Sequence, residues 1–191
     1  MAEQYTVESM LETRVARRNE LTAFPESFVD TVIPRYRRKL YSIIGRSVFE
    51  DPAMRPAITV QHPFSFSLIE VEPGKGAGLH SHTTEEVFMP IDGRLAVFWG
   101  DQGENEIELG PLDTITVPIG VMRGFRNPDT KTIQVIAIVG GDDGGRLTWH
   151  PELIQEAKEH GGQLDASGHL VGKEKGGSTP KSTPNRRATL A

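Results

Sequence analysis

Two histidines and a glutamate stand close together in the segment PGKGAGLHSHTTEEVFMPIDG. His80 and His82 are two residues apart, so on a β-strand both side chains point to the same side. Glu86 follows four residues after His82, across a predicted turn at Thr83 and Thr84, and can return on the next strand facing the same interior. Two imidazoles and one carboxylate are a ligand set that suits a divalent ion such as iron, manganese, nickel, copper or zinc.

The alternative is a pair of surface histidines in a loop beside a solvated glutamate, because a His-x-His pair alone occurs in many unrelated sequences. The elements around the three residues favour an interior site. Residues 57–141 contain short apolar runs separated by turn residues: FSFSLIEV, EEVFMPI, RLAVFW, TITVPI and TIQVIAIVG. Strands at this spacing predict an all-β domain, either a sandwich or a barrel.

The flanking segments differ from this region in composition. We expect residues 1–56 to form a helical extension with one strand at 40–44, because apolar residues recur there at helical spacing. Residues 142–170 predict a short strand and a helix at 151–160 that packs on the barrel. The tail, residues 171–191, is rich in Pro, Ser, Thr, Gly and Lys and is expected to be disordered.

Charge and composition exclude several classes of function. The net charge is −5, and the last 21 residues carry +4, which leaves −9 on the rest of the chain. An acidic body argues against a nucleic-acid partner. The chain has no cysteine, so it has neither disulfides nor thiolate chemistry. It contains no 18-residue apolar run and no signal-peptide pattern at the start, which predicts a cytoplasmic protein without a membrane partner.

The spacing around the histidines is similar to the first motif of the cupin superfamily. That motif is a glycine, five residues, His-x-His, three or four residues, a glutamate, six residues and a second glycine. The corresponding positions here are Gly74, His80, His82, Glu86 and Gly93. Every spacing is met.

A second stretch resembles the second cupin motif, which has an acidic turn, Pro-x-Gly, two residues, a histidine, three residues and an asparagine. The corresponding positions here are Asp113, Pro118, Gly120, Arg123 and Asn127, so arginine replaces the histidine. The glycine that usually precedes the aspartate is displaced to Gly110. The two motifs span residues 74–127, and their strand context extends the resemblance over 57–141. The resemblance implies a cupin barrel, a double-stranded β-helix or jelly roll, and a homodimer.

Arg123 changes what the resemblance implies. The family's histidine at this position is a fourth metal ligand, whereas arginine stays protonated and has no lone pair to donate. A guanidinium 5 Å from a divalent ion costs on the order of 6–7 kcal/mol at an effective dielectric constant near 20. Arg123 could therefore pair with Glu86 and displace the metal. Alternatively, it could bind a carboxylate or enolate substrate beside a bound metal and stabilise negative charge in the transition state.

Strand periodicity extends the candidate site to aromatic residues. Phe125 shares a face with Arg123, and Phe88 shares one with Glu86. On the preceding strand, His62, Phe64 and Phe66 share the more apolar face, which we expect to line the barrel. These residues would form an aromatic cavity for a small aromatic or apolar acid, with His62 at its mouth. A plain strand-end histidine is the alternative for His62.

Three functional hypotheses remain at this point. The first is a metal-dependent enzyme, with Fe(II) or else Mn, Ni or Zn bound by His80, His82 and Glu86, and with Arg123 and Glu86 as catalytic residues. By family analogy its reaction is dioxygenase-type oxidation of a carboxylated or enolic compound. The second is a non-redox isomerase or lyase with Glu86 or a histidine as the general base. The third is a small-ligand-binding cupin without metal or catalysis.

Overall fold

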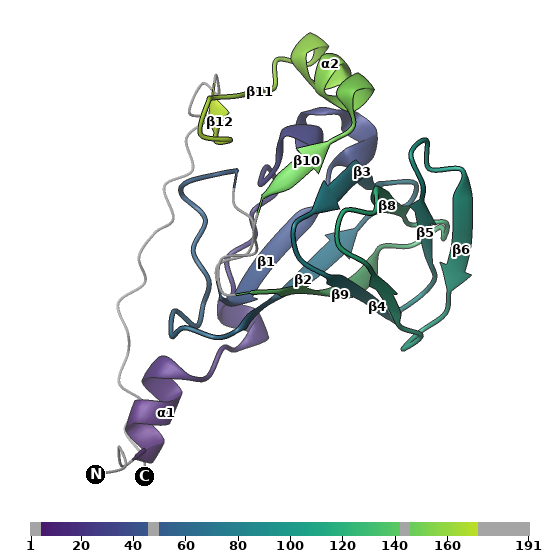
Figure 1. Ribbon diagram of the computed structural model, residues 1–191. Helices are drawn as coiled ribbons and strands as arrows, with labels where there is room; N and C mark the ends of the chain where they lie inside the picture. Colours follow the sequence, from purple (N-terminus) through teal and green to yellow (C-terminus); the bar gives the residue numbers. More distant parts are fainter. Residues whose placement is uncertain (1–4, 46–49, 142–145, 172–191) are drawn as a thin grey trace.

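The computed structural model describes residues 5–45, 50–141 and 146–171, and their centre is a barrel of two facing antiparallel sheets (Figure 1). The first sheet has the strand order β1 (Lys39–Ile44), β2 (Phe64–Val71), β9 (Ile133–Gly140), β4 (Glu86–Asp92) and β7 (Ile115–Val117). The second has the order β10 (Leu147–Trp149), β3 (Gly76–His82), β8 (Arg123–Arg126), β5 (Leu95–Trp99) and β6 (Asn105–Leu109). The all-β barrel expected from the sequence is confirmed.

Alternation along the strands places the core between the sheets. In β9, every second residue from Ile133 to Val139 is buried, and the residues between them are half-buried. Opposite them, β5 contributes Leu95 and Val97, both fully buried. Burial of these side chains supplies the main driving force for closing the two sheets on each other, at about 25 cal/mol per Å² of apolar surface.

The inward face of β2 is the opposite of the one we expected. Ser65, Ser67 and Ile69 are buried, whereas Phe64 and Phe66 are only half-buried and lie on the other face of the strand. The register explains this orientation, because Ser67 pairs with Ala137 and Ile69 with Val135, two inward-facing residues of β9. Apolar size alone therefore did not identify the interior face.

The N-terminal segment is less helical than its sequence pattern predicts. Its described residues, 5–45 and 50–56, contain one short α-helix, α1 (Val7–Thr13), and three 3₁₀ turns, η1 (Arg18–Glu20), η2 (Val29–Val32) and η3 (Pro34–Tyr36). The expected strand at 40–44 is present and pairs with β2, so this segment supplies an edge strand of the barrel. Phe24 forms an antiparallel β-bridge with Leu40. This bridge holds the chain around Phe24 in an extended conformation, which is incompatible with a helix there.

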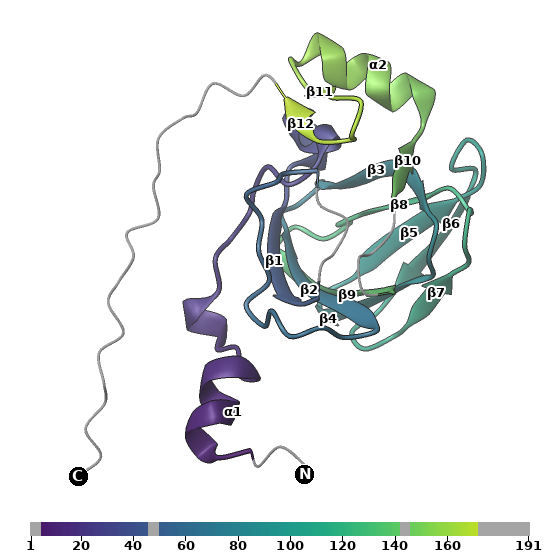
Figure 2. The ribbon, with the colours of Figure 1, turned by 60° about the vertical axis from the view of Figure 1, so that its left-hand side comes forward.

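Helix α1 extends away from the barrel (Figure 2) and has no buried residue. Its apolar residues Val7, Met10 and Leu11 are exposed to solvent. The homodimer stays a prediction.

The C-terminal helix matches its expected position. Helix α2 (Pro151–Glu159) follows β10 and buries Leu153 and Ala157. It packs against η2, and the chain then forms a two-stranded ribbon of β11 (Gln163–Leu164) and β12 (Leu170–Val171). Residues 172–191 of the predicted disordered tail lie outside the described residues. Among the helices of the described segments, none has the length and apolar character needed to cross a membrane.

Gly76, at the start of β3, offers a test of this packing. A Cβ atom at this position would lie 1.8 Å from the carbonyl oxygen of Phe125 on β8, a backbone atom that cannot rotate away. We therefore expect Gly76→Ala to lower the free energy of unfolding by roughly 3 kcal/mol or more, measured by urea denaturation. The control is Gly110→Ala, where the nearest atom to the new Cβ is a side-chain oxygen at 3.4 Å. Equal stability of the two variants would contradict the β3–β8 packing.

Candidate metal centre

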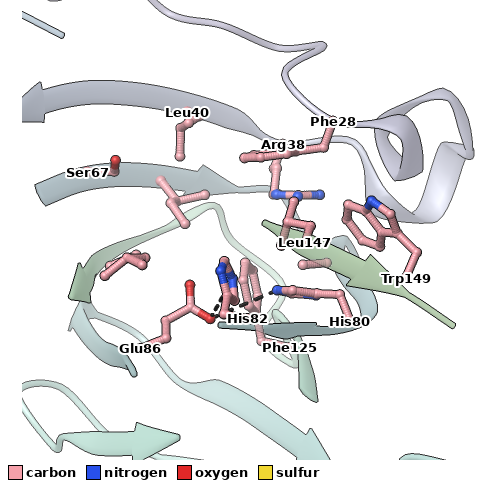
Figure 3. Close-up of a pocket in the computed structure, with 14 residues that line it drawn as sticks. Phe28, Arg38, Leu40, Ser67, His80, His82, Glu86, Phe125, Leu147 and Trp149 are labelled. Carbon is pink, nitrogen blue, oxygen red and sulfur yellow. Dashed lines mark ion pairs between the residues drawn. The ribbon is translucent and has the colours of Figure 1, made fainter. Parts of the chain in front are cut away.

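The two histidines and the glutamate converge inside the barrel (Figure 3). His80 and His82 point inward from β3, and Glu86 is the first residue of β4. Glu86 Oε2 lies 3.3 Å from His82 Nε2 and 3.9 Å from His80 Nε2, and the three candidate donor atoms all lie within 4.8 Å of one another. Metal–ligand bonds of about 2.0–2.2 Å place neighbouring ligand atoms roughly 3–4 Å apart. The cluster therefore fits a metal ion without large rearrangement.

A hydrogen bond orients His80 for metal binding. Its Nδ1 lies 2.7 Å from the carbonyl oxygen of Gly78, which can only accept, so Nδ1 carries the proton. The lone pair is then on Nε2, the atom that faces Glu86. Burial, together with the neighbouring His82, lowers the pKa of His80 to about 3, so the ring is neutral near pH 7. His82 Nδ1 is buried and has no partner within the described residues.

The carboxylate of Glu86 is held ionised in a buried position. Burial raises the pKa of Glu86, but the interactions with His82, His80 and Arg123 outweigh it and lower the pKa to about 2. Arg123 Nε donates a hydrogen bond of 3.0 Å to Glu86 Oε2, the oxygen that faces the two histidines. Within the described residues, Glu86 Oε1 accepts no hydrogen bond, and it points into the cavity (Figure 3).

Arg123 supports the cluster from the side. In the second sheet, His80 on β3 pairs with Trp149 on β10 on one side and with Arg123 on β8 on the other. The arginine is therefore the direct cross-strand neighbour of His80. Its side chain is completely buried, and Nη1 donates to the carbonyl oxygen of Val121. It does not line the cavity. Arg123 is thus a positioning residue for Glu86 in this structure, and its contact with a substrate stays a prediction.

The triad lies at the wall of a small cavity of about 40 Å³. A single water needs about 10–15 Å³ measured in this way, so the space corresponds to a few water-sized groups. An engineered cavity that binds benzene is roughly 150 Å³. The cavity in this form therefore accommodates a metal ion with small ligands, and an aromatic acid would need the lining side chains to move.

The predicted substrate-binding residues separate into two groups. Phe125 lines the cavity. The ring of Phe88 packs edge-on against the ring of Phe125, with the two centroids 5.2 Å apart. Phe64 and Phe66 lie on the outer face of β2, as described above. His62 lies outside the cavity as well: its ring stacks edge-on with Phe64, and Nδ1 contacts the carbonyl oxygen of Val60.

A group of buried charges next to the histidines was not predicted from the sequence. Arg38, from the basic run RYRRK at residues 35–39, lines the cavity and forms an ion pair of 2.8 Å with Asp30. Burial raises the pKa of Asp30, an effect that Arg38 opposes. Asp30 Oδ2 also accepts a hydrogen bond of 3.0 Å from the backbone N–H of Gly78, whose carbonyl oxygen orients His80. The available sequence signal was an aspartate within the apolar stretch FVDTVI.

Glu50 belongs to the same buried group. Its carboxylate accepts hydrogen bonds from Trp149 Nε1 at 2.6 Å and from the backbone N–H of Val29 at 2.5 Å. Trp149 in turn contacts the ring of His80, with centroids 5.1 Å apart. Burial raises the pKa of Glu50 to about 7, even though both hydrogen bonds oppose the shift.

Residues 67–139 match the family model described as the cupin domain. No curated protein matches the sequence. Among solved structures, the fold is similar to a cupin 2 conserved barrel domain protein from Salinispora arenicola, with 18% identity, coverage of 78% of this chain and 96% of the other, and a TM-score of 0.46.

Two further solved structures are similar at the same level. The polyketide cyclase RemF from Streptomyces resistomycificus has 16% identity and a TM-score of 0.49, and the match covers 67% of this chain and 79% of the cyclase. The DMSP lyase DddQ from Ruegeria pomeroyi has 19% identity and a TM-score of 0.46, over 59% of this chain and 51% of the lyase. At this level of similarity, none of them assigns an activity to the chain.

Replacing Arg123 tests its role as the partner of Glu86. Arg123→Gln leaves a buried carboxylate without its cation, which we expect to cost about 3–5 kcal/mol of stability. Zn²⁺ can supply the missing charge, so it should raise the melting temperature of the variant by more than that of the wild type. The matched control is Arg126→Gln on the same strand, whose pair with Glu106 is exposed and worth little. Equal effects of the two substitutions would contradict this role.

Glu50 predicts a specific pH dependence of stability. Its folded-state pKa of about 7 lies above the ordinary value of 4.5. Protonated Glu50 therefore contributes stability that is fully present below pH 4.5 and is lost as the pH rises through 7. We expect the metal-free wild type to lose up to about 3 kcal/mol relative to Glu50→Gln between pH 5 and pH 8, measured by urea denaturation. Parallel pH profiles of the two proteins would show that Glu50 is not the titrating group.

Proposed function

This chain belongs to the cupin superfamily, and on that premise we propose that it is a metal-dependent enzyme acting on a small organic compound inside the barrel. The observation that carries the proposal is the convergence of His80, His82 and Glu86 at the wall of a buried cavity. Three donors of this kind leave coordination positions open, which is typical of catalytic metal sites.

The proposed metal is a divalent ion, Fe(II) first, with Mn, Ni or Zn as alternatives. A bound ion would supply Lewis-acid polarisation of a substrate oxygen, and iron would add oxidation chemistry. His80 would present Nε2, since Gly78 holds the proton on Nδ1. Glu86 would contribute Oε2, while Arg123 keeps the carboxylate ionised and in place.

For the reaction, we propose dioxygenase-type oxidation of a small carboxylated or enolic compound, because two histidines and a carboxylate are the ligand set of non-haem iron oxygenases. A non-redox isomerase or lyase is the second candidate. The observation that favours it is Glu86 Oε1, which accepts no hydrogen bond within the described residues and faces the cavity, where it could accept a hydrogen bond from the substrate. The small cavity favours a compound of few atoms in either case.

Metal analysis tests this proposal directly. We expect near-stoichiometric iron or manganese after anaerobic loading and at least a tenfold loss of metal affinity in His82→Ala, because one of three ligands is removed. His62→Ala is the matched control, since His62 lies outside the cavity and should leave the metal content unchanged. A wild-type protein that takes up no divalent ion would favour a metal-free ligand-binding cupin. Oxygen uptake with small enolic and carboxylic acids then separates the redox reaction from the non-redox one.

A further inference from the structure

Arg38 lines the same cavity as the triad but comes from a different part of the fold. It immediately precedes β1, at the end of the N-terminal segment, and its side chain is only 5% exposed. Figure 3 shows it across the cavity from His80, His82 and Glu86. A buried guanidinium at the wall of a cavity is costly unless it has a structural or a ligand-binding role.

The hydrogen bonds of Arg38 account for only one of its three nitrogens. Nη1 donates to Asp30 Oδ2 at 2.8 Å and to the carbonyl oxygens of Tyr36 at 2.8 Å and Gly76 at 3.2 Å. Within the described part of the chain, neither Nε nor Nη2 donates a hydrogen bond. These two nitrogens form the edge of the guanidinium that binds a carboxylate with two parallel hydrogen bonds.

The charge balance of the cavity also favours an anion. Glu86 pairs with Arg123 and Asp30 pairs with Arg38, so these four charges cancel. Glu50, behind Trp149, adds at most one negative charge. A divalent ion in the triad would therefore leave positive charge among buried side chains, where charges are screened less than at the surface. A small anionic ligand would neutralise it.

We propose that the guanidinium of Arg38 binds the anionic group of the cavity's ligand, a carboxylate of few atoms. The proposal rests on the metal site of the proposed function. It moves the anion-recognising role expected for Arg123 to Arg38, because Arg123 does not line the cavity: its Nε and Nη1 are bound to Glu86 and Val121, and its Nη2 is buried without a partner in the described residues. The enzyme would thus hold its substrate between the metal on β3 and β4 and an arginine supplied by the N-terminal segment.

The test is a titration of the Co²⁺-loaded full chain with formate, followed by the visible absorption of the metal and by calorimetry. Formamide, which is neutral and of similar size, is the ligand control. Arg38→Lys keeps the positive charge but loses the two parallel donors, and we expect it to bind formate about tenfold more weakly with unchanged Co²⁺ affinity. Arg37→Gln is the matched control, since Arg37 is exposed and should bind formate like the wild type.

A second variant keeps the proposal falsifiable if replacement of Arg38 alone prevents folding. Asp30→Asn combined with Arg38→Gln removes both charges, so no buried charge is left unpaired, and the oxygen of the new carboxamide can still accept from the backbone N–H of Gly78. We expect this variant to bind Co²⁺ but to bind formate no better than formamide. Formate affinity equal to that of the wild type would overturn the proposal. Absence of Co²⁺ binding by the wild type, seen before formate is added, would instead overturn the metal site and this inference with it.

Discussion

The structure depends on keeping one carboxylate, that of Glu86, charged inside a closed barrel. A buried ionised group is costly unless hydrogen bonds and opposite charges compensate it. Arg123 provides both from the neighbouring sheet, and the two histidines face the same oxygen. Arg123, which replaces the histidine of the second motif, is thus used here to hold the carboxylate of Glu86 in place.

The N-terminal segment completes this arrangement from outside the barrel motifs. Asp30 binds the backbone of Gly78, and Gly78 orients His80. Glu50 binds Trp149, which packs on the same imidazole. Arg38 and Phe28 close the cavity on this side. The orientation of one histidine therefore depends on residues from three segments that are distant in sequence, which ties the integrity of the site to the docking of the whole extension.

The cavity sets a limit on the chemistry. Its lining combines small residues of β2 and β9, such as Ser67 and Ala137, with larger side chains of the extension and β10. The aromatic side chains of Phe64 and Phe66, which would have made the lining more apolar, lie on the outer face of β2 instead. A site of about 40 Å³ between the cluster of His80, His82 and Glu86 and a buried arginine has room for a small, charged compound rather than a large apolar one.

The sequence by itself determined the barrel and the triad. Short alternating strands specify the sheets, and the spacing of His80, His82 and Glu86 places them on one face because side chains alternate with period two. Only the tertiary structure decided what surrounds them. The inward face of β2 follows from its register with β9, and local hydrophobicity cannot report register. The burial of Arg38, Asp30 and Glu50 follows from long-range docking of the N-terminal segment, because a charged residue is buried only where distant partners meet it.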